Sequence, residues 1–170
     1  MATLHPEVDR LRKGRDRLVR LRNRLEIGRP APDAVPRHRD WVAREILAHI
    51  DEMLPYWLGE IERVLASPIE PAPFGRARSD VVRTLTVDRD RSLPITELYA
   101  RLDSGLERVV RRLLELDDRQ LMKKGLHKQR GAMTVQQIAE VMLAAHLEEH
   151  CTQLVAALDA ASASVPVVGA

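Results

Sequence analysis

Cysteine is almost missing from this sequence: Cys151 is the only one in 170 residues, so the chain can form no internal disulfide. That composition favours a reducing compartment, and we expect a cytoplasmic protein. Residues 1–6 lead into a charged segment without an apolar core, so no secretory signal is predicted. Apolar runs also stay far short of the ~20 residues that span a bilayer, which predicts no membrane partner.

Aromatic residues are scarce as well, at five in the whole chain, whereas proteins that stack nucleic-acid bases usually carry more. Residues 1–40 hold eleven Arg or Lys against six Asp or Glu, although the net charge of the chain is only +2. Because the basic excess belongs to one segment, we expect no nucleic-acid partner; a nucleic-acid binder working through its first helix is a minor alternative. The sequence has no phosphate-cradling glycine-rich loop and no convincing Ser/His/Asp or Cys/His set.

Helical periodicity is what the sequence does contain, in four segments separated by proline- and glycine-rich stretches. They span about residues 6–27, 40–66, 94–116 and 134–161. In each segment apolar residues recur every three or four positions, as on one buried face of a helix. We therefore predict an all-α protein, a four-helix bundle forming one domain over residues 1–161, with a flexible tail at 162–170.

Local signals add detail to the predicted helices and their connections. Asp40 is expected to cap the second helix and Pro55 to kink it. Thr134 and Gln137 have the spacing of a capping box at the start of the fourth helix. The long stretch 67–93 predicts a crossover connection between helices two and three, with a short strand or turn at about 81–87, because long structureless connections are uncommon. A polar loop is expected at 117–133.

Three of the six histidines fall on the apolar stripes: His49 on the second helix, and His146 and His150 on the fourth. Residues four apart share one helical face, with Cβ atoms about 5–6 Å apart, so two such imidazoles can bind one metal ion. A histidine from a facing helix completes a set of three, which with an open fourth position is typical of catalytic zinc-type sites. We predict that His49, His146 and His150 hold one divalent metal ion. The alternative is a set of buried core histidines, which would need three sets of hydrogen-bond partners.

Several other polar residues near these histidines have competing interpretations. Glu149 is a candidate to orient a ligand imidazole, whereas Glu148 is expected on a solvated helix face. His127 is a candidate acid or base at the end of the bundle, but an exposed loop histidine is the better interpretation. Cys151 points about 100° away from His150 around the helix, so it is expected to be a small core residue. No catalytic or thiol-binding residue is assigned from the sequence.

Two stretches of the chain resemble the DinB-like superfamily. The segment from Trp41 to His49 looks like its second helix, where a tryptophan stands eight residues before a metal-binding histidine. The segment from Gly131 to His150 looks like its fourth helix, with a glycine and a hydroxyl residue before a paired-histidine motif. The resemblance implies a four-helix bundle that is commonly dimeric and binds zinc or nickel. Its relatives include bacillithiol transferases and, less similar because they use glutamate where His146 stands, mycothiol-dependent maleylpyruvate isomerases.

The resemblance and the three histidines together predict a metal-dependent enzyme. The expected reaction is transfer of a low-molecular-weight thiol, such as mycothiol or bacillithiol, to a small electrophile, because a dication can lower the pKa of a bound thiol. A metal-bound hydroxide would give a hydrolase instead. The alternative is a non-enzymatic, metal-binding helical dimer or stress-associated protein. We expect a homodimer in either case.

Overall fold

A computed structural model of the chain describes residues 4–25, 42–77 and 80–163. The protein is mostly helical, in agreement with the predicted all-α class, and it adds a small sheet that the prediction did not include. In chain order the elements are α1 (His5–Leu25), α2 (Ala43–Ala66), β1 (Ala72–Phe74), α3 (Val81–Asp90), α4 (Ile95–Leu114), α5 (Asp118–Met122), β2 (Lys124–His127), β3 (Gly131–Thr134), α6 (Val135–Ile138), the π-helical segment η1 (Ala139–Ala145) and α7 (His146–Ala163).

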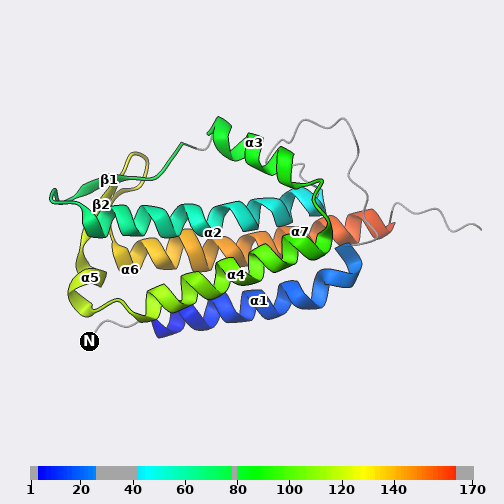
Figure 1. Cartoon of the computed structure of the whole chain (residues 1–170), viewed down its shortest axis with the longest axis horizontal. Helices are drawn as coiled ribbons and strands as arrows, with labels where there is room; N and C mark the ends of the chain where they lie inside the picture. The colour runs from blue at the N-terminus through cyan, green and yellow to red at the C-terminus, as the bar shows by residue number, and fades with distance from the viewer. Residues whose placement is uncertain (1–3, 26–41, 78–79, 164–170) are drawn as a thin grey trace, which may run out of the picture.

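Four long helical segments lie side by side, as Figure 1 shows: α1, α2, α4 and the continuous run from α6 through η1 to α7. Contacts join α1 to α4, α4 to α2, α2 to α7, and α7 back to α1. Their facing stripes supply most of the buried core, which includes Val8, Leu11, Leu18, Ile46, Met53, Ile61, Leu98, Leu102, Leu106, Ile138, Met142 and Leu154. These are stripe residues that the periodicity predicted to face inward. In the described ranges, no helix combines the length and apolarity needed to cross a bilayer.

The stretch between α2 and α4 differs from the prediction. The strand lies at β1, and the prediction of a strand or turn at 81–87 is wrong because those residues form most of α3. The Asp80 carboxylate accepts a hydrogen bond from the Arg83 backbone N–H at 2.9 Å and caps this helix. Val81 and Val82 are exposed, so their β-branched side chains gain nothing from a sheet there, and the cap decides the local structure. α3 packs on α2.

The stretch 117–133 is also more ordered than the predicted polar loop. It holds α5 and a hairpin in which β2 pairs antiparallel with β3, while β1 adds to β2 in parallel. Gly131 has φ +76°, a left-handed conformation that glycine adopts without strain, at the start of β3. The predicted capping box is confirmed: the Thr134 hydroxyl accepts from Gln137 N–H at 3.2 Å, and the Gln137 amide oxygen accepts from Thr134 N–H at 2.9 Å.

The ends of the predicted helices are only partly described. Asp40, Trp41 and the tail beyond residue 163 lie outside the described residues. α2 begins at Ala43, where the Glu45 carboxylate accepts a hydrogen bond from the Val42 N–H at 3.0 Å. The helix continues through Pro55 to Ala66.

Candidate metal centre

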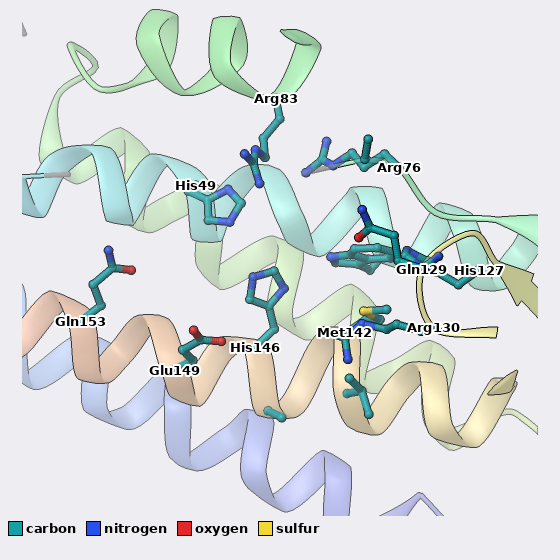
Figure 2. Close-up of a pocket in the computed structure, with 14 residues that line it drawn as sticks. His49, Arg76, Arg83, His127, Gln129, Arg130, Met142, His146, Glu149 and Gln153 are labelled. Atoms are coloured by element: carbon teal, nitrogen blue, oxygen red, sulfur yellow. The ribbon is translucent and has the colours of Figure 1, made fainter. Parts of the chain in front are cut away.

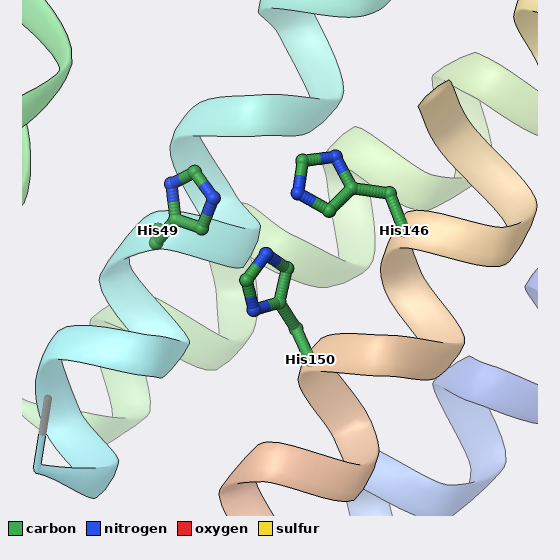
Figure 3. A group of neighbouring side chains, drawn as sticks. All are labelled: His49, His146 and His150. Atoms are coloured by element: carbon green, nitrogen blue, oxygen red, sulfur yellow. The ribbon is translucent and has the colours of Figure 1, made fainter. Parts of the chain in front are cut away.

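Two helices bring three histidines together (Figure 3). His49 projects from α2, and His146 and His150 project from α7 one helical turn apart. The centroid of the His150 ring lies 4.6 Å from that of His49 and 4.5 Å from that of His146. The centroids of the His49 and His146 rings are 5.6 Å apart. One ring nitrogen of each lies within 4.8 Å of the others. The structure therefore brings together the three residues that the sequence spacing selected.

The cluster is buried at its base and open on one side. His49 and His150 are 1% and 0% exposed, whereas His146 is partly exposed and lines a cavity. Imidazole binds metal in its neutral form, and a site that largely excludes water suits that form. His49 and His146 both line this cavity, which therefore gives access to the cluster.

Gln153 fixes the orientation of the His150 ring. The Nδ1 atom of His150 lies 2.9 Å from the Gln153 side-chain oxygen. Because an amide oxygen only accepts hydrogen bonds, this contact assigns the ring hydrogen to Nδ1 and leaves the Nε2 lone pair for a ligand. The His150 ring is thereby held in the tautomer that can coordinate through Nε2.

Glu52 occupies the corresponding position beside His49. Its Oε2 atom lies 3.5 Å from His49 Nδ1. Its two carboxylate oxygens accept hydrogen bonds from the Arg76 guanidinium at 2.5 and 2.6 Å. Burial alone would raise the pKa of Glu52, but its contacts with His49 and Arg76 lower that pKa to about 2. The side chain is therefore an anion 3.5 Å from a candidate ligand, close to the carboxylate–imidazole pairing that orients metal-binding histidines in many proteins.

This carboxylate is not the one that the sequence analysis selected. The sequence pointed to Glu149, which is exposed and lines the cavity, and its role in orienting an imidazole stays a prediction. The expectation for Glu148 is only partly met: its half-exposed carboxylate forms a two-point ion pair with Arg10 of α1, at 2.8 and 2.6 Å. The spacing of Glu52, three residues after His49 on one helix, was the signal that could have identified it.

A π-helical segment leads directly into the histidine pair. η1 ends at Ala145, and α7 begins at His146. π-Helical turns are rare, and they occur often at functional sites because their wider turn shifts the register of the residues that follow. This segment was not foreseen, since the sequence through it keeps an ordinary helical pattern.

The cavity beside the cluster has a volume of about 710 Å³. Figure 2 shows His49 and His146 facing each other, Arg83 and Arg76 above them, and the hairpin residues Gln129, His127 and Arg130 together at the right. Three guanidinium groups line it, from Arg76, Arg83 and Arg130, but among the described residues Glu149 is the only acidic side chain that does so. The cavity is large enough for a small molecule and its lining is cationic.

His127 departs from its predicted exposed loop position. It ends β2, it is 6% exposed, and it lines the cavity. Burial and the nearby Arg130 lower its pKa below the ordinary value. The ring packs against Gly75, where φ is +85° and an added Cβ would lie 2.3 Å from His127 Cδ2. A glycine some fifty residues earlier therefore makes room for this histidine.

Cys151 meets its prediction as a core residue. It is 1% exposed, and its Sγ atom faces α1, 3.9 Å from the Gly14 carbonyl oxygen. Burial raises the pKa of its thiol to about 11. Among the described residues, the cluster of candidate ligands contains no cysteine or carboxylate.

Comparison with known proteins places the chain in a family. Residues 11–151 match the family described as the mycothiol maleylpyruvate isomerase N-terminal domain, which is part of the DinB-like superfamily. The match is to the isomerases, for which the histidine pattern predicted the weaker resemblance. No curated protein and no solved structure matches the chain significantly. Because the matched region covers most of the chain, this protein belongs to the mycothiol maleylpyruvate isomerase N-terminal domain family.

Proposed function

We propose that this protein is a metal-dependent enzyme in which His49, His146 and His150 hold one divalent ion of the zinc or nickel type. The observation that carries the proposal is the convergence of three imidazoles, of which His150 is hydrogen-bonded to Gln153 and His49 lies 3.5 Å from the Glu52 carboxylate. An all-nitrogen donor set suits zinc and nickel, whereas magnesium and calcium prefer oxygen. The residues present therefore fit such an ion.

The proposed reaction joins a low-molecular-weight thiol to a small electrophile. The family takes its name from a mycothiol maleylpyruvate isomerase, which supports a thiol cofactor such as mycothiol or the related bacillithiol. A bound dication would supply Lewis acidity that lowers the pKa of a thiol, or of water if the reaction is a hydrolysis. The chain itself would hold the ion with three histidines, orient two of them through Glu52 and Gln153, and admit both reactants through the cavity beside His146.

The architecture that we propose is a four-helix bundle of the DinB-like type, with residues 67–93 as the crossover between α2 and α4. The closed circuit of contacts among α1, α4, α2 and α7 supports it. We further propose that the working unit is a homodimer, on the basis of the superfamily resemblance.

Metal analysis of protein purified without an affinity tag tests the site. We expect about one zinc or nickel ion per chain in the wild type and in His5→Ala, because His5 is exposed on α1 far along the chain from the cluster. His146→Ala should lose most of the metal. If the untagged wild type carries no transition metal and takes up none on titration, the proposed metal site is wrong.

A thiol-consumption assay tests the reaction. Wild-type protein should accelerate electrophile-dependent loss of a bacterial thiol, while the metal-free protein and His49→Ala should not. Activity of the metal-free protein should return on addition of zinc or nickel. Equal rates for all three proteins with every thiol tried would favour the non-enzymatic, metal-binding helical protein instead.

A further inference from the structure

The hairpin side of the cavity carries hydrogen-bond donors that the metal site does not use. Trp57 comes eight residues after His49 on α2, which places it about 12 Å further along that helix, toward β1 and β2. His127 ends β2, and Arg130 immediately precedes β3. All three line the same cavity as His49 and His146, and Figure 2 shows the two hairpin residues on one side of it.

The Trp57 indole carries a buried N–H group that forms no hydrogen bond within the described residues. Its side chain is 6% exposed, and its Nε1 atom has no hydrogen-bond partner among the described residues. An indole N–H can only donate, and a buried donor left without an acceptor costs about 1–3 kcal/mol. Trp57 also lines the cavity, so an acceptor on a bound ligand can satisfy this donor if the indole turns toward it.

The other two residues add donors and a positive charge. His127 Nδ1 accepts a hydrogen bond from the Gln129 backbone N–H at 3.2 Å, so the neutral ring carries its hydrogen on Nε2. Arg130 is exposed and forms no ion pair within the described part of the chain. It differs in this from Arg76, whose charge is matched by Glu52. These residues therefore offer N–H donors, and the positive charge of Arg130 is not matched by an acidic partner among the described residues.

We propose that Trp57, His127 and Arg130 form a subsite for a carboxylate carried by one of the reactants. A carboxylate supplies only acceptors and a negative charge, the complement of this donor set. The inference rests on the proposed function in one respect, namely that this cavity receives the reactants. The carboxylate can belong to the thiol or to the electrophile, and the two sources require different tests.

Tryptophan fluorescence measures binding at this subsite directly. Trp41→Phe leaves Trp57 as the only tryptophan, so its emission reports on its own surroundings. In that background succinate, a carboxylate without a thiol, should give a saturable change. Arg130→Gln should weaken succinate binding about tenfold or more, because it removes a charged hydrogen-bond partner. Arg119→Gln, at an exposed arginine of α5 outside the cavity lining, is the matched control and should bind as the parent does.

The two sources are separated with N-acetylcysteine and N-acetylcysteine amide, which differ only in the carboxylate. Tighter binding of the acid, lost in Arg130→Gln, assigns the carboxylate to the thiol. Equal binding of both thiols, with succinate still dependent on Arg130, assigns it to the electrophile. A Trp57 signal that does not respond to any carboxylate, or that responds equally in Arg130→Gln, overturns the subsite.

Metal-free protein distinguishes this proposal from that of the metal site. Succinate binding that depends on Arg130 should persist after the metal is removed, because none of the three residues belongs to the histidine cluster. If the wild type proves to hold no metal yet binds succinate in this way, the metal-dependent reaction fails and the subsite stands. If succinate binds only when metal is present and independently of Arg130, the subsite fails and the metal site stands.

Discussion

Replacing Glu52 by glutamine removes one charge beside His49 while almost preserving the shape of the side chain. In the native protein the carboxylate lies 3.5 Å from His49 Nδ1 and takes two contacts from Arg76. An amide has one acceptor oxygen, and its NH₂ group can only donate, so glutamine cannot serve Arg76 and His49 together as the two carboxylate oxygens do. The His49 imidazole then loses an anionic partner that orients the ring and strengthens it as a metal ligand.

The expected loss follows from the burial and charge of Glu52. Removing such an outer partner typically lowers metal affinity 10–100-fold, which corresponds to about 1.4–2.7 kcal/mol. The Glu52 side chain is 10% exposed, so solvent and salt screen its charge little. Its contacts with His49 and Arg76 lower its pKa to about 2, so the group is fully ionised in neutral solution. We therefore expect at least a tenfold weaker affinity for zinc in Glu52→Gln.

A competition titration of zinc against a chromophoric chelator measures this difference. Glu62→Gln is the matched control, because Glu62 lies on the same helix and forms a similar two-point ion pair with Arg112, at 2.6 and 3.3 Å, without touching the cluster. Wild type and Glu62→Gln should bind zinc equally, and thermal unfolding of the metal-free proteins should show that each variant is folded. Equal zinc affinity for all three folded proteins would refute the role of Glu52.

Three further predictions concern residues around the cluster. In a urea titration, Gly75→Ala should lower the free energy of unfolding by about 1–3 kcal/mol, because Gly75 has a positive φ and an added Cβ would clash with His127. The control Gly59→Ala, in mid-helix with open space around it, should raise the free energy of unfolding by up to about 1 kcal/mol. Burial and Arg130 lower the pKa of His127, so the unfolded chain binds more protons below about pH 6.5. Stability of the metal-free protein should therefore fall as the pH drops from 7.5 to 5.5, and less so in His127→Gln. Cys151, buried and with its thiol pKa raised to about 11, should react with a disulfide reagent far more slowly in the native protein than in urea; comparable rates would place the thiol at the surface.

Local sequence patterns predicted most of the helices and the pairing of His146 with His150. The spacing of Leu98, Leu102 and Leu106 predicts a buried stripe because a helix repeats every 3.6 residues, and these side chains are buried. The same periodicity places His146 and His150 on one face. Thr134 caps its helix through a contact with a residue three positions away. Each of these features depends on residues within about one turn of each other. The meeting of His49 with the pair on α7 is not local, and it was predicted from the place of all three histidines on inward-facing stripes.

Features that depend on distant parts of the chain could not be obtained in this way. β1 pairs with β2 across about fifty residues, and the burial of His127 depends on the room that Gly75 leaves. The basic bias of residues 1–40 has a similar explanation. Arg15 and Arg24 of α1 form ion pairs with Asp103 of α4 and Asp159 of α7, at 2.5 and 2.6 Å. Part of that positive charge is therefore matched by acidic residues on the neighbouring helices, which the linear sequence does not reveal.

The cavity draws its two kinds of chemistry from different parts of the fold. The histidines stand on α2 and α7, long helices whose packing against α1 and α4 fixes their positions. Gln129 and Arg130 stand on the exposed turn between β2 and β3, where a change of sequence disturbs little of the core. A substitution in that turn can therefore alter which molecule the cavity accepts while the histidine cluster keeps its geometry. On this reasoning the metal site and the selectivity for the reactant can vary independently within one helical framework.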